Sequence, residues 1–116
     1  MTDVFDELEV APWNEVSRLH EQLLQQQLDY VVERSEFYRD RIGALRGQVR
    51  SLEDLRYLPF TAKDDVRQSL LAKPPLGLHL AAEPSEVVQI QSSSGTTGMP
   101  TFVAATKRDL ETWNSM

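Results

Sequence analysis

The chain has 116 residues, of which 41% are hydrophobic and 26% are charged, so it fits one small domain or part of a larger one. Its 18 acidic and 12 basic residues give a formal net charge of −6, which argues against a nucleic-acid-binding surface. The absence of cysteine excludes disulfides, thiolate metal sites and a cysteine nucleophile within this chain. We see neither a basic-then-apolar leader nor an apolar run of membrane-spanning length, and a soluble cytoplasmic protein is the default expectation.

A long helix is predicted over residues 13–34, after an acidic tail that covers residues 1–12. Apolar residues recur in this helix at spacings of three to five, which places most of them on one side. The opposite side is acidic and rich in glutamine, unlike the basic polar face of a membrane-surface helix. We therefore expect an amphipathic helix that packs on a protein core. Its apolar positions are Val16, Leu19, Leu23, Leu28, Val31 and Val32.

Ser35 is a predicted N-cap for a short second helix that runs through Arg41. Phe37, Tyr38 and Ile42 would form its buried side. Arginines recur between residues 34 and 50, but acidic residues lie among them. An ion-paired, solvated surface is therefore expected there in preference to an anion site.

Two sequences of the form Ser/Thr-x-x-Asp, at Ser51–Asp54 and Thr61–Asp64, have the pattern of a capping box. The second one predicts a helix from Ala62 to Leu71. Residues 72–85 contain three prolines and one glycine, which predict an extended connection.

Strands are expected only in the last third of the chain. Glu86–Gln91 is rich in β-branched residues and predicts one strand, and Thr101–Ala105 predicts a second. Thr106–Asp109 has another capping-box pattern and predicts a helix that carries Leu110 and Trp113. Two strands and one helix cannot form a sheet domain by themselves, so we expect an α/β fold that is incomplete within this chain.

The segment between the two predicted strands, residues 92–101, reads SSSGTTGMPT. Gly95 and Gly98 permit positive φ angles and a close approach of the backbone to a ligand. Successive backbone N–H groups in such a bend can bind an anion, and hydroxyl groups add donors for phosphate oxygens. These features favour a phosphate-binding loop, although composition also allows a flexible hairpin loop without a ligand. The hydroxyl residues concerned are Ser93, Ser94, Thr96 and Thr97.

Two common nucleotide-binding motifs do not fit this segment. A Walker loop requires lysine after its last glycine and then a helix, whereas Met99 and Pro100 follow Gly98 and a strand is predicted next. A dinucleotide-binding fingerprint requires a third glycine at GxGxxG spacing, and none is present.

The loop does resemble the phosphate-binding signature of adenylate-forming (AMP-binding) enzymes, which appears here as SSGTTGMPT. Thr101 stands where many members of that superfamily have lysine and where the phenylacetate–CoA ligase branch usually has threonine. Other segments resemble that branch in the same order: EFYRDRI, SLEDLRYLPFTAKDDVR and EVVQIQSSSGTTGMPTFVAATKRDLETW. The resemblance covers roughly residues 16–116, and Glu36 departs from it, because family members often have proline before the Phe-Tyr pair.

The resemblance implies an N-terminal part of the large adenylate-forming domain. Residues 13–82 would be its helical cover, and residues 83–116 would begin the AMP-binding domain, with the phosphate-binding loop at 92–101. By resemblance, the residues that bind the β- and γ-phosphates of ATP are Ser93, Ser94, Gly95, Thr96, Thr97 and Gly98. Pro100 and Thr101 would support the return of the loop into the next strand. No catalytic residue and no metal ligand is predicted in this chain, since His20 and His79 are isolated.

The implied function is that of an AMP-forming acid–CoA ligase. Such an enzyme uses Mg²⁺-ATP to convert an aryl or acyl carboxylate, phenylacetate among the candidates, to an acyl-adenylate, and then transfers the acyl group to CoA. The family's magnesium ligands and catalytic lysine have no counterpart here, so the chain by itself is expected to be inactive. Its expected partners are a small carboxylic acid, ATP, CoA, the remainder of the adenylation domain and a second copy in a homodimer, with no nucleic acid and no membrane.

Two other readings stay open on the sequence. The first is a non-catalytic interaction module, or one subunit of a split adenylate-forming enzyme. The second is a small helical protein whose Ser/Gly loop has no nucleotide role.

Overall fold

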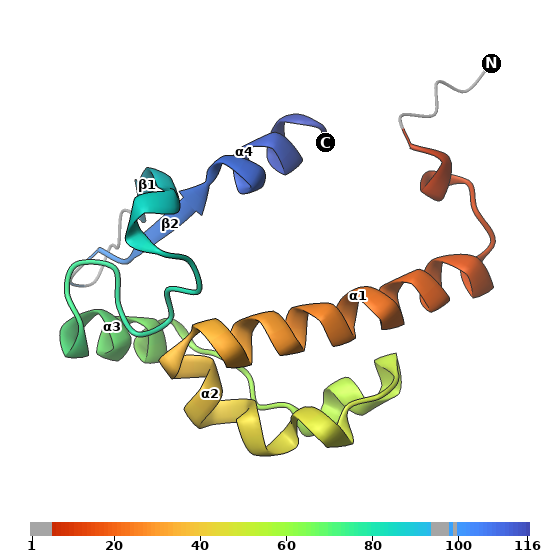
Figure 1. Ribbon diagram of the computed structural model, residues 1–116, viewed down its shortest axis with the longest axis horizontal. Coiled ribbons are helices and arrows are strands. Elements are labelled where there is room, and N and C mark those ends of the chain that lie inside the picture. Colours follow the sequence, from red (N-terminus) through yellow and green to blue (C-terminus); the bar gives the residue numbers. More distant parts are fainter. Residues whose placement is uncertain (1–5, 94–97, 99) are drawn as a thin grey trace.

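The computed structural model describes residues 6–93, 98 and 100–116 (Figure 1). A helical part comes first and a small antiparallel sheet with one more helix follows, as predicted from the sequence. The helices are α1 (Trp13–Arg34), α2 (Glu36–Ile42), α3 (Lys63–Ala72) and α4 (Lys107–Asn114), and the strands are β1 (Val87–Ser92) and β2 (Phe102–Thr106). In the described ranges, short 3₁₀ helices occupy Glu7–Glu9, Gly43–Gln48, Leu52–Tyr57 and Pro84–Glu86.

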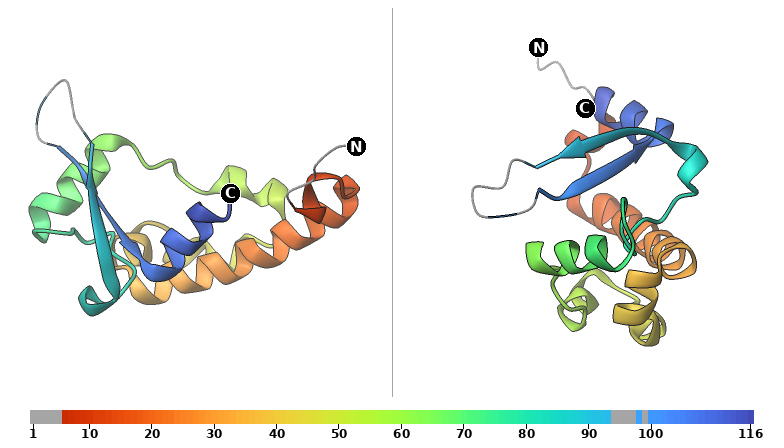
Figure 2. Two further views of the ribbon diagram at one scale, coloured as in Figure 1. Left: turned by 90° about the horizontal axis from the view of Figure 1, so that it is seen from above. Right: turned by 90° about the vertical axis from the view of Figure 1, so that its left-hand side faces the viewer.

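The core of the helical part lies where α1 crosses α2 (Figures 1 and 2). Leu28 and Val32 of α1 pack there with Ile42 of α2 and with Val49, whose side chain has no exposed surface. The apolar side of α1 was predicted from its spacing, and its C-terminal half is the half that is buried. Leu23 and Trp13, nearer the N-terminus of α1, are about half and two-thirds exposed at 48% and 68%.

Ser35 joins α1 to α2 and is completely buried. Its extended backbone, with φ −116°, ends α1, and its hydroxyl accepts a hydrogen bond of 3.4 Å from the N–H of Tyr38. The same hydroxyl donates to the carbonyl of Leu78 at 3.0 Å. The predicted N-cap is therefore confirmed, and it also fixes the distant 77–80 segment against α2.

The predicted capping box at the start of α3 is wrong by one residue. The helix begins at Lys63, and the carboxylate of Asp65, not that of Asp64, accepts the N–H of Ala62 at 2.7 Å. Asp65 also lies 3.2 Å from the guanidinium of Arg41 in α2. This ion pair between two helices explains the choice, because only one of the two neighbouring carboxylates can face both partners.

Two connections also differ from the predictions. Gly43 and Gly47, which the sequence suggests as breaks in the connection after the second helix, lie within a 3₁₀ helix. Residues 72–85 contain turns and a final 3₁₀ helix in place of an extended strand-like path. At Ser51–Asp54 the box forms as predicted, and hydrogen bonds from the N–H groups of Arg50 and Ser51 lower the pKa of the Asp54 carboxyl.

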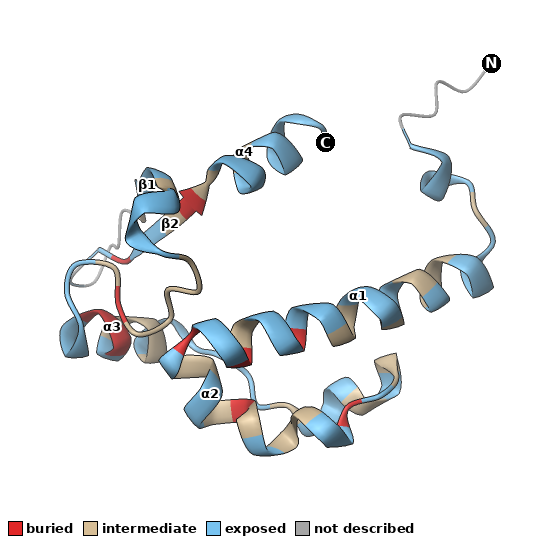
Figure 3. Cartoon of the chain, viewed as in Figure 1, coloured by how far each residue is buried: buried red, intermediate tan, exposed pale blue. Residues whose placement is uncertain are grey.

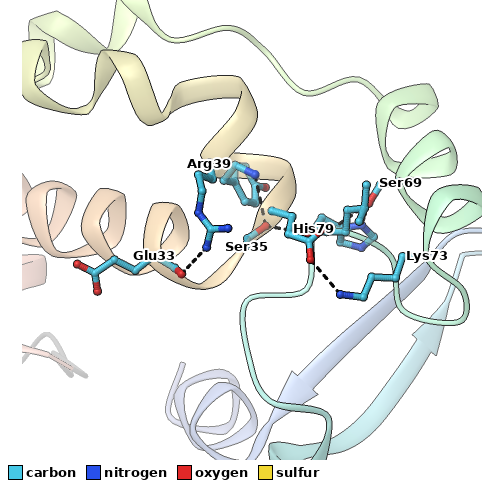
Figure 4. A network of polar contacts seen from close by, with 9 residues as sticks. Glu33, Ser35, Arg39, Ser69, Lys73 and His79 are labelled. Atoms are coloured by element: carbon cyan, nitrogen blue, oxygen red, sulfur yellow. Dashed lines mark hydrogen bonds and ion pairs between the residues drawn. The ribbon is translucent and has the colours of Figure 1, made fainter.

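The arginines between residues 34 and 50 form an ion-paired surface, as predicted. Arg46 lies 3.5 Å from Asp29 and 3.9 Å from Glu33. Arg39 donates to the carbonyls of Val32 and Glu33 at 3.1 and 2.7 Å (Figure 4). The basic side chains therefore bind nearby carboxylates and carbonyls of the same chain.

β1 and β2 form a two-stranded antiparallel hairpin, with Ile90 opposite Ala104 and Gln91 opposite Val103. Most of its residues are exposed (Figure 3), including Ile90 at 53% and Val103 at 50%, which the register places on opposite faces. Ala105, at the end of β2, is an exception and is buried. Both faces of the hairpin therefore carry uncovered apolar side chains.

The predicted capping box of the last helix is present. The carboxylate of Asp109 accepts from the N–H of Thr106 at 2.7 Å, and the Thr106 hydroxyl accepts from the N–H of Asp109 at 3.3 Å. Within the described residues, none of the helices combines the length and the apolar character that crossing a membrane would require.

Candidate functional site

The candidate site is the 92–101 loop, which joins the two strands of the hairpin. Its two ends are held together by Ser93 and Thr101, the residues directly after β1 and directly before β2. The N–H of Ser93 donates to the carbonyl of Thr101 at 2.9 Å, and the N–H of Thr101 donates to the Ser93 hydroxyl at 3.2 Å. The two hydroxyl oxygens are 2.5 Å apart. Ser93 and Thr101 thus form a closed neck at the base of the loop.

Thr101 is 6% exposed, so its hydroxyl is protected from water at this neck. Threonine suits this place because its methyl group fills space while its hydroxyl serves the hydrogen bond. Ser93 was predicted as a phosphate ligand and Thr101 as loop support. The structure shows both at the neck, and contact of Ser93 with a phosphate stays a prediction.

Gly98 has a φ of +129°, a conformation that residues with a side chain rarely adopt. A Cβ at this position would meet no atom within 4 Å among the described residues, so backbone conformation requires the glycine and crowding does not. The positive φ expected for this glycine is confirmed. Ser94, Gly95, Thr96, Thr97 and Met99 lie outside the described residues, and their predicted roles stay predictions.

His79 has no other histidine near it in the sequence, but in the structure it is bonded to α3. Its ring Nδ1 lies 2.7 Å from the Ser69 hydroxyl of α3, which also accepts the N–H of His79 at 3.0 Å (Figure 4). The ring also lies near the backbone of Phe102, the residue after Thr101, whose carbonyl raises the pKa of His79. A neutral imidazole protonated on Nε2 satisfies all of these bonds, with Nδ1 accepting from the Ser69 hydroxyl.

Burial lowers the pKa of His79 below its ordinary 6.5, and the carbonyl of Phe102 opposes part of this shift. The lowered pKa agrees with a neutral ring, in which Nδ1 accepts from the Ser69 hydroxyl. His79 therefore has a structural role: it bonds to Ser69 of α3 and lies beside the start of β2.

A cavity of about 270 Å³ lies between α3 and the C-terminal end of the loop. Arg67, Gln68 and Leu71 line it from α3, and Gly98 and Pro100 line it from the loop. Nothing in the sequence distinguished Arg67 from other surface arginines of a predicted helix. Its position became evident only when the fold brought α3 beside the loop.

The described residues contain no group of three or more histidine or acidic side chains arranged to hold a metal ion. The described part of the site contains the hydroxyl groups of Ser93 and Thr101 at the neck, and both Arg67 and Asp64 line the cavity. Hydroxyl and guanidinium donors bind negatively charged oxygen atoms.

Known proteins are similar to this chain in sequence and in fold. The chain is 43% identical over 108 residues to a phenylacetate–coenzyme A ligase of Thermus thermophilus, and this stretch covers 90% of the chain. It is 34% identical over 113 residues to the enzyme of the same name from Pseudomonas putida, and 36% identical over 111 residues to that of Escherichia coli. No protein-family model matches the chain.

Among solved structures, 2-hydroxyisobutyryl-CoA ligase in complex with 2-HIB-AMP and CoA matches with a TM-score of 0.77 and 33% identity. The match covers 84% of this chain and 21% of that protein. The same ligase in an open conformation matches with a TM-score of 0.76. Both are acyl-CoA ligases, so the recognised resemblance to this class is confirmed by sequence and by fold.

The chain spans only 23–25% of the length of the phenylacetate–CoA ligases that it matches. The matched portion is the N-terminal part of these acid–CoA ligases. The chain is therefore similar to one segment of a much larger enzyme.

Proposed function

We propose that this chain is the N-terminal portion of an AMP-forming acid–CoA ligase, in which the 92–101 loop binds the phosphates of ATP. The observation that carries the proposal is the match to phenylacetate–CoA ligases at 34–43% identity over at least 90% of the chain. The closed neck between Ser93 and Thr101 and the positive φ of Gly98 agree with it, because the first holds the two ends of the loop together and the second is a backbone conformation that favours glycine.

The reaction that we propose has two steps. A carboxylate oxygen of the acid attacks the α-phosphorus of ATP, the bond to the bridging oxygen breaks, and pyrophosphate leaves with the electron pair. The thiol of CoA then attacks the acyl carbon, releases AMP and forms the thioester. Mg²⁺ would screen the phosphate charge during the first step, and its ligands are expected outside this chain.

The residues of this chain serve binding and orientation in that scheme. We propose that Ser93, Ser94, Gly95, Thr96, Thr97 and Gly98 hold the β- and γ-phosphates, and that Pro100 and Thr101 fix the return of the loop. Such donors stabilise the charge that develops on the leaving pyrophosphate. No residue of this chain is assigned as nucleophile or general base.

The acid is proposed only as a class, a small aryl or acyl carboxylate. The relatives named for phenylacetate and the structures of 2-hydroxyisobutyryl-CoA ligase match this chain comparably, at 34–43% and 29–33% identity. Their acids differ in size and in aromatic character, so this segment does not separate them. The cytoplasmic location expected from the sequence is likewise a proposal.

The test is ATP–pyrophosphate exchange by the complete ligase that carries this chain, with a panel that includes phenylacetate and 2-hydroxyisobutyrate. We expect exchange with at least one acid, and formation of its CoA thioester when CoA is added. Thr96→Ala should reduce the exchange by about tenfold or more, the typical effect of removing a hydrogen bond to a charged group. Thr112→Ala, which removes an exposed hydroxyl of α4, is the matched control.

Unchanged exchange in Thr96→Ala would remove the proposed role of the loop. No exchange with any acid would remove the proposed activity.

The exposed hairpin favours a second form of the same idea, in which the chain is one subunit of a split enzyme. Ile90 and Val103 lie uncovered on opposite faces of the hairpin, so further sheet or helix elements are needed on both sides. We propose that the rest of the adenylation domain covers them, whether it is encoded in the same polypeptide or in another one. Activity that appears only after mixing two purified polypeptides would establish the split form.

A further inference from the structure

Helix α1 has two apolar sides, and its core contacts lie on one of them. Leu28 and Val32 pack on that side with Val49. Gln25 lies on the same side and donates to the carbonyl of Val49 at 2.6 Å. Because a helix turns by roughly 100° per residue, the opposite side of α1 carries a second apolar row. This row consists of Val16, Leu19, Leu23 and Tyr30.

The second row is only partly covered by the rest of the described chain. Leu23 and Tyr30 expose 48% and 39% of their surface, and Val16 and Leu19 are half-buried. Along residues 13–27 of α1 no residue is buried (Figure 3). A helix with apolar side chains on opposite sides is normally packed on both of them. The second row therefore needs a further partner.

The spacing of the second row is that of a coiled-coil seam. Positions 16, 19, 23, 26 and 30 alternate by three and four residues, which is the pattern of the a and d positions of a heptad. Gln26 is polar, and two such amides that face each other can exchange hydrogen bonds. The row therefore fits another helix that lies along α1.

The residues that flank the row favour a second copy of α1 as that helix. In a parallel pair, each residue before an a position lies beside the residue five further along in the other helix, and charges at these places set the orientation. This arrangement brings Asp29 of one copy to Arg34 of the other, and Glu15 to His20. An antiparallel pair would instead bring Glu15 near Asp29, two like charges. The helix is therefore complementary to itself in the parallel orientation.

Both charged groups are accessible for such a pair. The Arg34 guanidinium lies 4.8 Å from the centre of the Tyr30 ring, which places its charge at the edge of the row. Among the described residues, the ion pairs closer than 4.0 Å include none with Arg34. Asp29 lies 3.5 Å from Arg46, but its side chain is 60% exposed and can still be reached by a second copy.

Arg34 also has competing partners in its own chain. Glu33, Glu83 and Glu86 line one cavity with it. Glu86 already accepts the N–H of Glu83 at 2.9 Å, and none of the three carboxylates lies within 4.0 Å of the guanidinium. The contacts of the single chain therefore leave the charge of Arg34 without an ion pair in the described structure.

We propose that two copies of this chain associate through the second row, with α1 parallel to α1 and Leu23 facing Leu23. This inference does not depend on the proposed function, because no nucleotide takes part. The row spans only residues 16–30, which is short of the three to four heptads of an independent coiled coil. Because α1 is already folded on its own core, association does not include the cost of forming the helix. We expect a weak, reversible dimer.

The chain has no cysteine, so a single introduced cysteine reports which residues meet. The test compares Leu23→Cys with Leu55→Cys in the 116-residue chain that also carries Ile90→Thr and Val103→Thr, which reduce the association expected at the hairpin. Under mild oxidation, Leu23→Cys should form a disulfide-linked dimer roughly tenfold faster or more, because only a paired α1 brings the two sulfur atoms within bonding reach. Leu55 is the matched control, since it is exposed to a similar extent at 43%.

A mixture of Leu19→Cys and Leu23→Cys proteins distinguishes the two orientations. A parallel pair gives products that join each variant to itself, whereas an antiparallel pair joins position 19 to position 23. Predominance of the mixed product would overturn the inference. Equal rates for Leu23→Cys and Leu55→Cys would overturn it as well.

Charge reversal tests the flanking pair. Arg34→Glu and Asp29→Lys should each weaken the dimer by roughly tenfold or more in sedimentation equilibrium, because like charges then meet. The double variant restores opposite charges and should return the dissociation constant to near that of the parent protein. Glu83→Gln, which removes a carboxylate from the cavity beside Arg34, is the control and should have no effect.

A double variant as weakly associated as the single ones would contradict the proposed pair. Circular dichroism melting checks the folding of each variant. If Asp29→Lys does not fold, the cross-linking of Leu23→Cys decides.

The rest of the adenylation domain is the alternative occupant of the row. In the complete ligase, alkylation of the cysteine in Leu23→Cys is followed by mass spectrometry of its peptide, and light scattering gives the mass. We expect the cysteine to be protected at high protein concentration and to react faster on dilution, since the dimer is reversible. Protection in a monomer, or fast reaction at every concentration, would overturn the inference. Neither readout needs ATP or an acid, so an inactive ligase would contradict only the proposed function.

Discussion

Gly77 lets the chain turn directly against the His79 ring, and no other residue fits there. Its φ is +84°, and a Cβ would come within 2.6 Å of the ring and 2.9 Å of the Ser69 hydroxyl. Its N–H donates to the carbonyl of Lys73 at 2.7 Å, and the next N–H, of Leu78, donates to that of Ser69 at 3.3 Å. One glycine therefore allows α3, the turn and His79 to pack together.

We predict that Gly77→Ala opens this turn. A residue with a side chain at positive φ costs about 1–3 kcal/mol, and the contact with the His79 ring adds to it. Hydrogen exchange at the N–H groups of Gly77 and Leu78 should accelerate by about tenfold or more. Gly47→Ala, where a Cβ meets no described atom within 4 Å, is the control and should leave both rates unchanged. Equal rates in the two variants would contradict this account.

His79 should make the same region sensitive to acid. Its pKa in the folded protein is lowered from 6.5 by burial, so the unfolded state binds the proton more readily. The stability that the neutral ring contributes is complete above pH 6.5 and is lost as the pH falls through the lowered value. We expect the exchange of the His79 N–H, corrected for its intrinsic pH dependence, to accelerate as the pH falls below 6.5. A His79→Gln variant should lack this transition, and a transition of the same size in that variant would contradict the role of His79.

At the scale of elements, the two acidic residues at the start of α3 differ in their partners. Asp65 accepts the N–H of Ala62 and pairs with Arg41, whereas Asp64 faces the cavity. We predict that Asp65→Ala destabilises the protein by about 1–2 kcal/mol, as loss of a helix cap does. Asp64→Ala should stay within about 0.5 kcal/mol, as surface changes do. Urea unfolding measures both, and the reverse order would restore the box predicted from the sequence.

The sequence predicted the elements where local chemistry decides them. The spacing of apolar residues in α1, the N-cap at Ser35 and the box at Thr106–Asp109 all appear in the structure. At α3 the local signal pointed to Thr61 with Asp64, one residue before the pair of Ala62 and Asp65 that the structure uses. Threonine is the better cap, but the ion pair between Asp65 and Arg41 in another helix decides the register, and a tertiary contact of this kind has no local signature.

The candidate site was also predictable only where local sequence decides it. The loop follows from its glycines and hydroxyl groups between two strands, and the supporting place of Thr101 from the resemblance to adenylate-forming enzymes. His79 and Arg67 were not predictable as neighbours of the loop, because α3 meets the hairpin only in the folded chain. Their positions depend on contacts between segments separated by turns, which periodicity does not report.

At the scale of the whole molecule, the hairpin lacks the cover that its composition requires. Ile90, Phe102 and Val103 expose 53%, 36% and 50% of their surface, and the register distributes them over both faces. A two-stranded hairpin of this kind is marginally stable in water. The helical part has its own small core, so the two parts of the chain should differ in stability.

We therefore predict that the 116-residue chain by itself associates or is partly disordered at the hairpin. Size-exclusion chromatography with light scattering should show species larger than 13.2 kDa, and the combined change Ile90→Thr with Val103→Thr should reduce them, since both apolar faces lose surface. Leu8→Thr, a change at an exposed leucine outside the hairpin, is the control. A monodisperse wild-type monomer that melts in one cooperative transition would contradict the prediction.

The hydroxyl pair between Ser93 and Thr101 has a consequence for redesign. It joins two positions that are eight residues apart, and so fixes how many residues the loop between them contains. Residues inserted between Ser93 and Thr101 would lengthen the loop, and residues deleted there would break the hydrogen bond between the two hydroxyl groups. Under the proposed role of the loop, attempts to accommodate bulkier nucleotide analogues should therefore exchange side chains between Ser93 and Thr101 and keep the number of residues unchanged.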